Sequence, residues 1–169
     1  ALIVNGKMLG VVEAKKLQVG AMNVLEQAKR YSKDVDNTIG EWKKYRIPFL
    51  YSSNGELIYF IDVRESKNIN RQVFSFHTPK ALENLFNSKL ATAFQWLNEN
   101  KIDNEFIRPY QKTAIQEFEK ALSDCKRLML LAMATGTGKT FTTVNLVYRM
   151  LASGYAKRIL FLVDRKSLA

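Results

Sequence analysis

The first part of the chain alternates short apolar runs with turn signals. Asn5-Gly6 separates two apolar runs within residues 1–15, and Asn54-Gly55 separates two more within residues 46–66. Asn-Gly between apolar runs favours a β-hairpin, because both positions tolerate positive φ. Between the hairpins, residues 20–35 carry apolar side chains three and four apart, which predicts a helix. The pattern therefore predicts a small α+β unit built as hairpin, helix and hairpin.

The pattern of the second part is different. Apolar spacing over residues 80–100 predicts one helix, and residues 108–124 predict another, with Pro109 in its first turn, where a missing N–H costs nothing. Continuous apolar runs at 127–133 and 158–164 are typical of buried strands, and a glycine turn and a helix lie between them. Strand, helix and strand with both strands fully apolar predict a parallel βαβ unit. The predicted fold class is thus α/β.

Length and composition set the limits for these elements. The chain has 169 residues, enough for one full domain or two small ones, since domains cluster near about 100–150 residues. A net charge of +10 favours a polyanionic partner or simply a solvated basic surface. No apolar run is long enough to span a bilayer and no signal peptide is evident, so we expect a cytoplasmic protein without a membrane partner. The single Cys125 rules out an internal disulfide and a thiolate metal cluster.

A glycine-rich turn follows the first of the two apolar runs. Its glycines let backbone N–H groups converge on a phosphate, and the following helix adds its unpaired donors and positive dipole end. Met133 stands where the strict P-loop pattern has glycine, but the later residues that form the phosphate cradle are present. The turn predicts a nucleoside triphosphate site in which the lysine binds phosphate and the last threonine ligates Mg²⁺. Its residues are Thr135, Gly136, Thr137, Gly138, Lys139 and Thr140.

Together, "ATGTGKT" and the upstream "RPYQKTAI" resemble superfamily 2 helicases and translocases. The resemblance implies that Gln111 reads the adenine edge, which favours ATP over GTP; the alternative is an ordinary exposed helix glutamine. The segment "RILFLVDR" is similar to helicase motif Ia, because Arg165 follows Asp164 where a Walker B motif would have an acid. Arg165 is therefore expected to face a nucleic-acid backbone.

Two charged residues interrupt the apolar strand of the first hairpin. Glu13 and Lys15 lie two apart, so both project from one face of a strand. A carboxylate that holds Mg²⁺ beside an ammonium that orients water or stabilises developing charge suits phosphodiester hydrolysis. The alternative is a cross-strand ion pair on a solvated edge, which the E-x-K pattern taken alone favours.

The helix after this hairpin adds Gln27 and Tyr31, four apart and so on one helix face. The combination of E-x-K with Q-x-x-x-Y resembles the PD-(D/E)xK nucleases of the branch that carries a Gln-Tyr motif. The resemblance implies catalytic roles for Glu13, Lys15, Gln27 and Tyr31, with Glu13 as a metal ligand. One element departs from the family pattern: its first metal-binding aspartate belongs at the start of the hairpin, and residues 1–12 contain no acid.

Seven segments, from "VVEAKK" to "RILFLVDR", resemble in the same order the restriction subunit of type I restriction-modification enzymes. The resemblance implies a restriction-endonuclease-like domain at 1–78, a helical connector at 79–105 and the start of a RecA-like motor domain at 106–169. It also implies double-stranded DNA as substrate, ATP and Mg²⁺ as cofactors, and modification and specificity subunits as partners.

Two other interpretations stay open from the sequence. The chain could come from a superfamily 2 translocase whose N-terminal domain does not cleave, or from a DNA-binding module that holds nucleotide without catalysis. In each case we expect the 169-residue chain alone not to hydrolyse ATP, because nothing after Thr140 supplies a second Mg²⁺-side carboxylate or a group that positions water.

Overall fold

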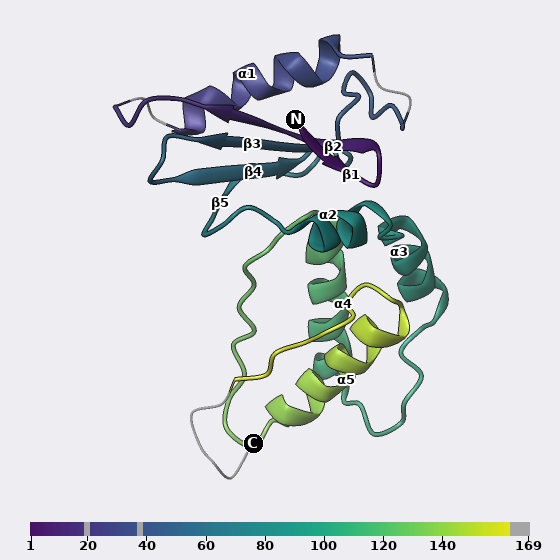
Figure 1. The fold of residues 1–169 in the computed structure, drawn as a ribbon. Coiled ribbons are helices and arrows are strands. Elements are labelled where there is room, and N and C mark those ends of the chain that lie inside the picture. The colour runs from purple at the N-terminus through teal and green to yellow at the C-terminus, as the bar shows by residue number, and fades with distance from the viewer. Residues whose placement is uncertain (19–20, 37–38, 163–169) are drawn as a thin grey trace. The chain divides into compact units, whose positions relative to one another are not determined.

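A computed structural model describes residues 1–18, 21–36 and 39–162 of the chain (Figure 1). The chain divides into two compact units, Ala1–Asn87 and Ser88–Ala169. Each unit has its own hydrophobic core, formed by residues of that unit alone. The described part contains a five-stranded mixed sheet and five helices, so the fold class is α/β, as predicted.

The first unit contains the sheet, whose strands lie side by side in chain order. The strands β2 and β3 are parallel, and every other neighbouring pair is antiparallel. The helix α1 (Ala21–Asp34) connects the two parallel strands. The strands are β1 (Leu2–Val4), β2 (Lys7–Ala14), β3 (Phe49–Ser53), β4 (Ile58–Asp62) and β5 (Arg71–Val73).

Both predicted hairpins and the helix between them are confirmed. The first turn places Asn5 and Gly6 at φ 50° and 73°, the left-handed conformation that Asn-Gly accepts readily. In the second turn the Asn54 side chain accepts hydrogen bonds from the backbone N–H groups of Glu56 and Leu57. The sequence did not predict β5, a three-residue strand at the edge of the sheet.

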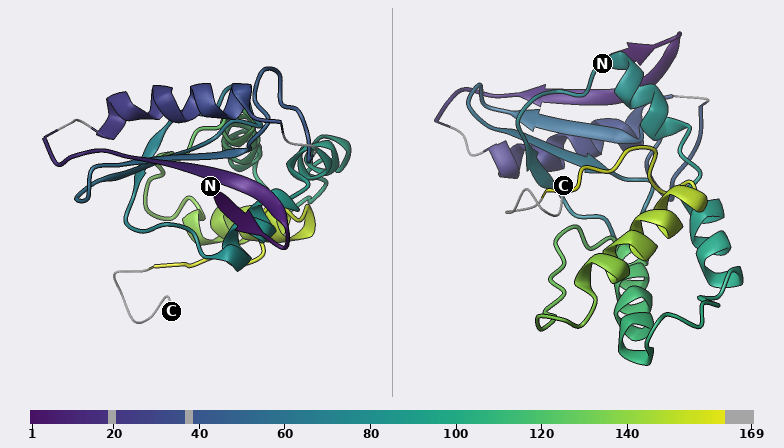
Figure 2. Two further views of the ribbon diagram at one scale, coloured as in Figure 1. Left: turned by 45° about the horizontal axis from the view of Figure 1, so that its top comes forward. Right: turned by 90° about the horizontal axis from the view of Figure 1, so that it is seen from below.

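The two faces of the sheet carry separate cores. The helix α1 lies along one face (Figure 2), where Leu25 and Ala28 are buried against Val11 and Leu50. On the other face, α2 (Pro79–Phe86) contributes Leu82 to a second cluster. That cluster also contains Val4, Leu9, Phe49, Tyr51 and Phe60. Burial on both faces explains why the strands are rich in apolar residues with little alternation.

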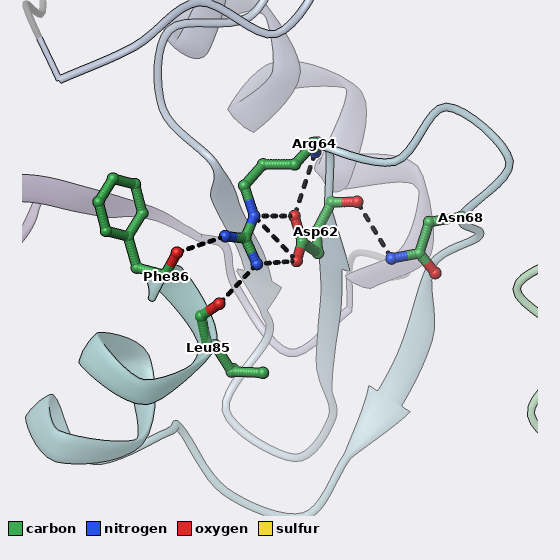
Figure 3. Close-up of polar contacts among 5 residues, drawn as sticks. All are labelled: Asp62, Arg64, Asn68, Leu85 and Phe86. Carbon is green, nitrogen blue, oxygen red and sulfur yellow. Dashed lines mark hydrogen bonds and ion pairs between the residues drawn. The ribbon is translucent and has the colours of Figure 1, made fainter. Parts of the chain in front are cut away.

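The guanidinium of Arg64 fixes α2 to the end of β4 (Figure 3). It donates to the Asp62 carboxylate, with an Nη2 to Oδ2 distance of 2.8 Å. It also donates to the carbonyl oxygens of Leu85 and Phe86, the last residues of α2, at 2.8 and 2.9 Å. The last carbonyls of a helix lack the N–H group four residues further on, so the guanidinium of Arg64 caps the C-terminus of α2. The prediction of one helix over 80–100 is wrong, because α2 ends at this cap and α3 (Leu90–Glu99) begins separately.

The second unit packs α3 against α4 (Pro109–Ser123) and α5 (Lys139–Ala152). Leu97, Leu122 and Met150 form one small core, and Ile102, Ile115 and Leu146 form another. The helices at 108–124 and after the glycine turn were predicted, and Pro109 occupies the first helical position. Among the helices that the structure describes, none combines the length and apolarity needed to cross a membrane.

The predicted parallel strands of the second unit are not formed. Residues 127–133 and 158–162 belong to no strand, and residues 163–164 lie outside the described part. Leu128, Leu130 and Leu160 are 95, 90 and 81% exposed, although their apolar runs are typical of buried strands. A parallel strand depends on hydrogen bonds to neighbours far along the chain. The described residues of this unit supply no such neighbour, so a pattern that is correct for a buried strand does not produce one.

Candidate functional site

The first candidate site lies at the end of β2. Glu13 stands opposite Ser52 of β3, and the backbone N–H of Lys15 donates to the Ser53 carbonyl over 2.9 Å, which extends the pairing past the strand. The Lys15 ammonium lies 2.8 Å from a Glu13 carboxylate oxygen. The predicted shared strand face is therefore confirmed. The contact is common to the two interpretations, an ion pair and a nuclease centre.

The helix α1 covers the side of the sheet to which this pair belongs. Val11, on the same strand two residues before Glu13, is buried against α1. On α1 the Gln27 amide donates to the Tyr31 hydroxyl over 2.8 Å. The hydrogen bond to Glu13 raises the pKa of Lys15 above its ordinary value. Burial opposes this rise, and electrostatic interactions with Glu13 and Tyr31 add to it. The fold thus brings the four predicted residues to one side of the sheet.

The chemistry of this pair fits part of a Mg²⁺ site. No group of three metal-binding side chains occurs among the residues described, and Glu13 is the carboxylate at this position. Magnesium retains several waters and commonly takes one or two carboxylates together with phosphate oxygens. Glu13 could therefore supply one protein ligand, with the remaining positions taken by water, by DNA phosphate or by a residue elsewhere in the protein.

The second candidate site is the glycine turn before α5. Gly136 and Gly138 have φ of 79° and 81°, and Gly138 is the residue that caps the helix N-terminus. The Lys139 ammonium lies back over the turn, 3.0 Å from the Ala134 carbonyl oxygen and 3.3 Å from that of Met133. Thr140 follows in the first helical turn and is exposed. Positive-φ glycines at a helix N-terminus with a lysine above them fit a bound phosphate chain.

Gln111 of α4 reaches this turn from the other side. Its side chain is buried, with 3% exposed, so the alternative of an ordinary exposed glutamine is wrong. Its amide nitrogen donates to the Thr137 carbonyl over 2.9 Å, and its amide oxygen accepts from the backbone N–H of Arg108 over 3.0 Å. Gly138 has φ of 81°, which favours glycine, and a Cβ there would lie 2.5 Å from the same amide nitrogen. The adenine contact expected for Gln111 stays a prediction.

Sequence reasoning missed Tyr110. Its hydroxyl donates to the Thr137 carbonyl over 2.9 Å and accepts from the Arg108 guanidinium over 3.1 Å. The signal was its position in the "RPYQ" segment beside Gln111, but tyrosine at a helix N-terminus has no distinctive periodicity. Arg165, expected on a nucleic-acid backbone, lies outside the described residues.

Two family models match different parts of the chain. Residues 1–86 match the model described as "Type I restriction enzyme EcoKI endonuclease subunit second domain". Residues 105–169 match the model described as "Type III restriction enzyme, res subunit". The first match covers the Glu13–Lys15 pair and the second covers the glycine turn.

Curated relatives extend these matches to nearly the whole chain. It is 34% identical to the EcoKI endonuclease subunit of Escherichia coli (strain K12), covering 99% of this chain and 18% of the relative. It is 30% identical to the EcoAI endonuclease subunit of Escherichia coli, covering 96% of this chain and 20% of the relative. A solved fragment attributed to an HsdR subunit from Vibrio vulnificus YJ016 shares 23% identity at a TM-score of 0.37, over 86% of this chain and 26% of that one. The chain therefore spans about a fifth of the length of the curated relatives.

Proposed function

We propose that this chain, which belongs to the family of type I restriction enzyme endonuclease subunits, contains part of a DNA-cleaving centre and the start of an ATP-driven DNA motor. In this proposal residues 1–78 are endonuclease-like and 106–169 begin a RecA-like motor domain. Residues 79–105 connect them, beginning with α2, which packs on the sheet of the first unit. The match to the EcoKI endonuclease subunit over nearly the whole chain supports this arrangement. The whole protein then cleaves double-stranded DNA and moves along it.

In the cleaving centre, Glu13 would hold Mg²⁺, which when bound polarises the scissile phosphate. Lys15 would orient the attacking water or stabilise negative charge that develops on the phosphate. That role requires a charged ammonium, which lysine has at neutral pH, and the hydrogen bond to Glu13 raises the pKa of Lys15 further. Gln27 and Tyr31, joined by their hydrogen bond, would orient Lys15 or contact DNA from α1.

In the motor, the glycine turn would bind the phosphates of ATP. Backbone N–H groups from Thr135 to Gly138 form the cradle, Lys139 would release its two carbonyl contacts to reach phosphate, and Thr140 would ligate Mg²⁺. Gln111 would read the adenine edge, and Arg165 would contact the DNA backbone.

The proposed partners follow from charge and from the family. A net charge of +10 favours binding to DNA, because lysine and arginine gain affinity by releasing counterions from phosphates. A type I enzyme also includes modification and specificity subunits, and we propose that the whole protein assembles with them.

The observation that supports cleavage most directly is that the Glu13–Lys15 pair, 2.8 Å apart, lies on the side of the sheet covered by α1, which carries the hydrogen-bonded Gln27 and Tyr31. The test uses the full-length subunit assembled with its partner subunits, given double-stranded DNA, ATP and Mg²⁺. Glu13→Ala and Lys15→Ala should each abolish cleavage and leave ATP hydrolysis intact.

Each rival interpretation predicts a different result in the same assay. Wild-type cleavage in both variants would mean that the pair is a surface ion pair. ATP hydrolysis without cleavage by the wild-type assembly would favour a translocase with a non-cleaving N-terminal domain. Nucleotide binding with neither hydrolysis nor cleavage would favour a nucleotide-binding module.

A further inference from the structure

The Thr137 carbonyl, in the middle of the glycine turn, accepts two hydrogen bonds from one helix. The Tyr110 hydroxyl and the Gln111 amide nitrogen both lie 2.9 Å from this oxygen. Both donors come from the first turn of α4, which is anchored by the fully buried Ile115. A carbonyl held by two donors from a packed helix is fixed in direction.

The direction of this carbonyl sets the direction of an N–H group. In a trans peptide the C=O and the following N–H point to opposite sides. Because the Thr137 oxygen points toward α4, the N–H of Gly138 points away from α4. Gly138 has φ of 81° and no Cβ, so local sterics do little to stop this peptide from turning over. The contacts from α4 supply the restraint that the glycine lacks.

Arg108 fixes the orientation of both donors, the Tyr110 hydroxyl and the Gln111 amide. Its guanidinium donates to the Tyr110 oxygen over 3.1 Å, which leaves the hydroxyl hydrogen for Thr137. Its backbone N–H donates to the Gln111 amide oxygen over 3.0 Å, so the amide nitrogen faces the turn. Arg108, Tyr110 and Gln111 thus act as one brace on one peptide.

We propose that Tyr110 is a positioning residue for phosphate binding: its hydroxyl holds the Thr137–Gly138 peptide with the N–H directed at the phosphate chain of the nucleotide. This inference rests on the proposed function of the turn as an ATP site. Tyr110 acts on the nucleotide through the backbone of the turn and is 44% exposed, so the folded core does not depend on its hydroxyl.

The test compares Tyr110→Phe with Tyr148→Phe in the full-length subunit. Tyr148 lies on α5 of the same unit and is 64% exposed, so its variant is the matched control. Tyr110→Phe should weaken binding of fluorescent ADP and ATP analogues by about 3- to 10-fold, the worth of about one hydrogen bond. The KM for ATP should rise by a similar factor, kcat should change less, and the melting temperature without nucleotide should stay within about 2 °C of wild type. Arg108→Gln should show a smaller loss in the same direction.

The results separate this inference from the proposed function. Suppose that the wild type binds nucleotide, Lys139→Ala does not, and Tyr110→Phe binds like the wild type. The proposed role of Tyr110 is then wrong, and the proposal of an ATP site is still supported. If the wild type binds no nucleotide, both are wrong. A lower melting temperature with unchanged nucleotide affinity in Tyr110→Phe would mean a purely structural role and would also overturn the proposal.

Discussion

The side-chain amide of Gln27 donates to the hydroxyl of Tyr31 over 2.8 Å, one turn further along α1. We predict that Tyr31→Phe, which removes the acceptor, lowers DNA cleavage by the assembled enzyme by about 3- to 10-fold, the worth of about one hydrogen bond. Neither residue holds metal in the proposed centre, so the loss should be smaller than in Glu13→Ala. Initial cleavage rates check this, with Tyr148→Phe as control. A rate equal to that of Glu13→Ala would give Tyr31 a direct catalytic role instead.

Because the pKa of Lys15 is raised, we expect the stability of the folded protein to change with pH in the alkaline range. The hydrogen bond to Glu13 raises this pKa above 10.5, so the folded state binds the proton more tightly than the unfolded state. The contribution of Lys15 to stability is therefore complete below the unfolded pKa and is lost as pH rises through the folded one. An NMR titration of the Lys15 side chain should show its pKa move back toward 10.5 in Glu13→Gln. An unchanged titration would mean that Glu13 does not hold the ammonium in solution.

Lys139→Ala tests the glycine turn. Removal of the one side chain proposed to bind phosphate there should lower ATP hydrolysis by the full-length subunit at least about 100-fold. Folding should be intact, because the exposed ammonium contacts two loop carbonyls and no core residue. Hydrolysis assays and thermal melts check the two parts separately, with the exposed Lys112→Ala on α4 as control. Hydrolysis at the wild-type rate would remove the turn from the mechanism.

Local signals explain the parts of the fold that the sequence predicted well. The Asn5-Gly6 and Asn54-Gly55 turns depend on the conformational freedom of the residues within them. Glu13 and Lys15 share a face because strand side chains alternate, whatever lies beyond the strand. Such features need no knowledge of distant parts of the chain.

Distant contacts explain what the sequence did not predict. At the break between α2 and α3, the end of α2 is capped by Arg64, about 20 residues earlier in the chain. The contact between Tyr110 and Thr137 joins residues 27 apart, and no periodic pattern connects them. The strand predicted over 127–133 needed neighbours that the described residues do not supply. In each case the local sequence does not specify the distant group that the structure needs.

In the second unit, we expect substitution of Arg149 to cause the largest loss of stability. Its buried guanidinium pairs with Glu119 and donates to the carbonyls of Leu97 and Asn100, which joins α3, α4 and α5. Arg149→Met leaves the largely buried Glu119 carboxylate without this partner and should cost about 3–5 kcal/mol of unfolding free energy. Denaturant unfolding followed by Trp96 fluorescence, in a Trp42→Phe background, isolates this unit, since Arg149 lies 5.7 Å from the Trp96 ring. A loss below about 1 kcal/mol would mean that water replaces the missing partner.

In the first unit, we expect a corresponding loss of stability when Arg64 is substituted. Its guanidinium binds Asp62 and caps α2 through two carbonyls (Figure 3). It also lies 4.9 Å from the Phe49 ring, and both charged side chains are largely buried. Arg64→Ala should therefore cost about 3–5 kcal/mol and release the end of α2. Arg64→Lys should recover only part of this, because an ammonium cannot bind carboxylate and carbonyls together in the planar geometry of guanidinium.

Trp42 reports on this change, because its ring meets the Phe86 ring of α2 edge to face, with centroids 6.2 Å apart. In a Trp96→Phe background, Arg64→Ala should shift Trp42 emission to longer wavelength before the sheet unfolds, since release of α2 exposes the indole to water. Lys80→Ala, which removes the exposed pair with Glu83 on the same helix, is the control and should cost at most about 1 kcal/mol. If Arg64→Ala matched this control in both stability and emission, the apolar contact of Leu82 with the sheet would be enough to hold α2, and the cap would contribute little.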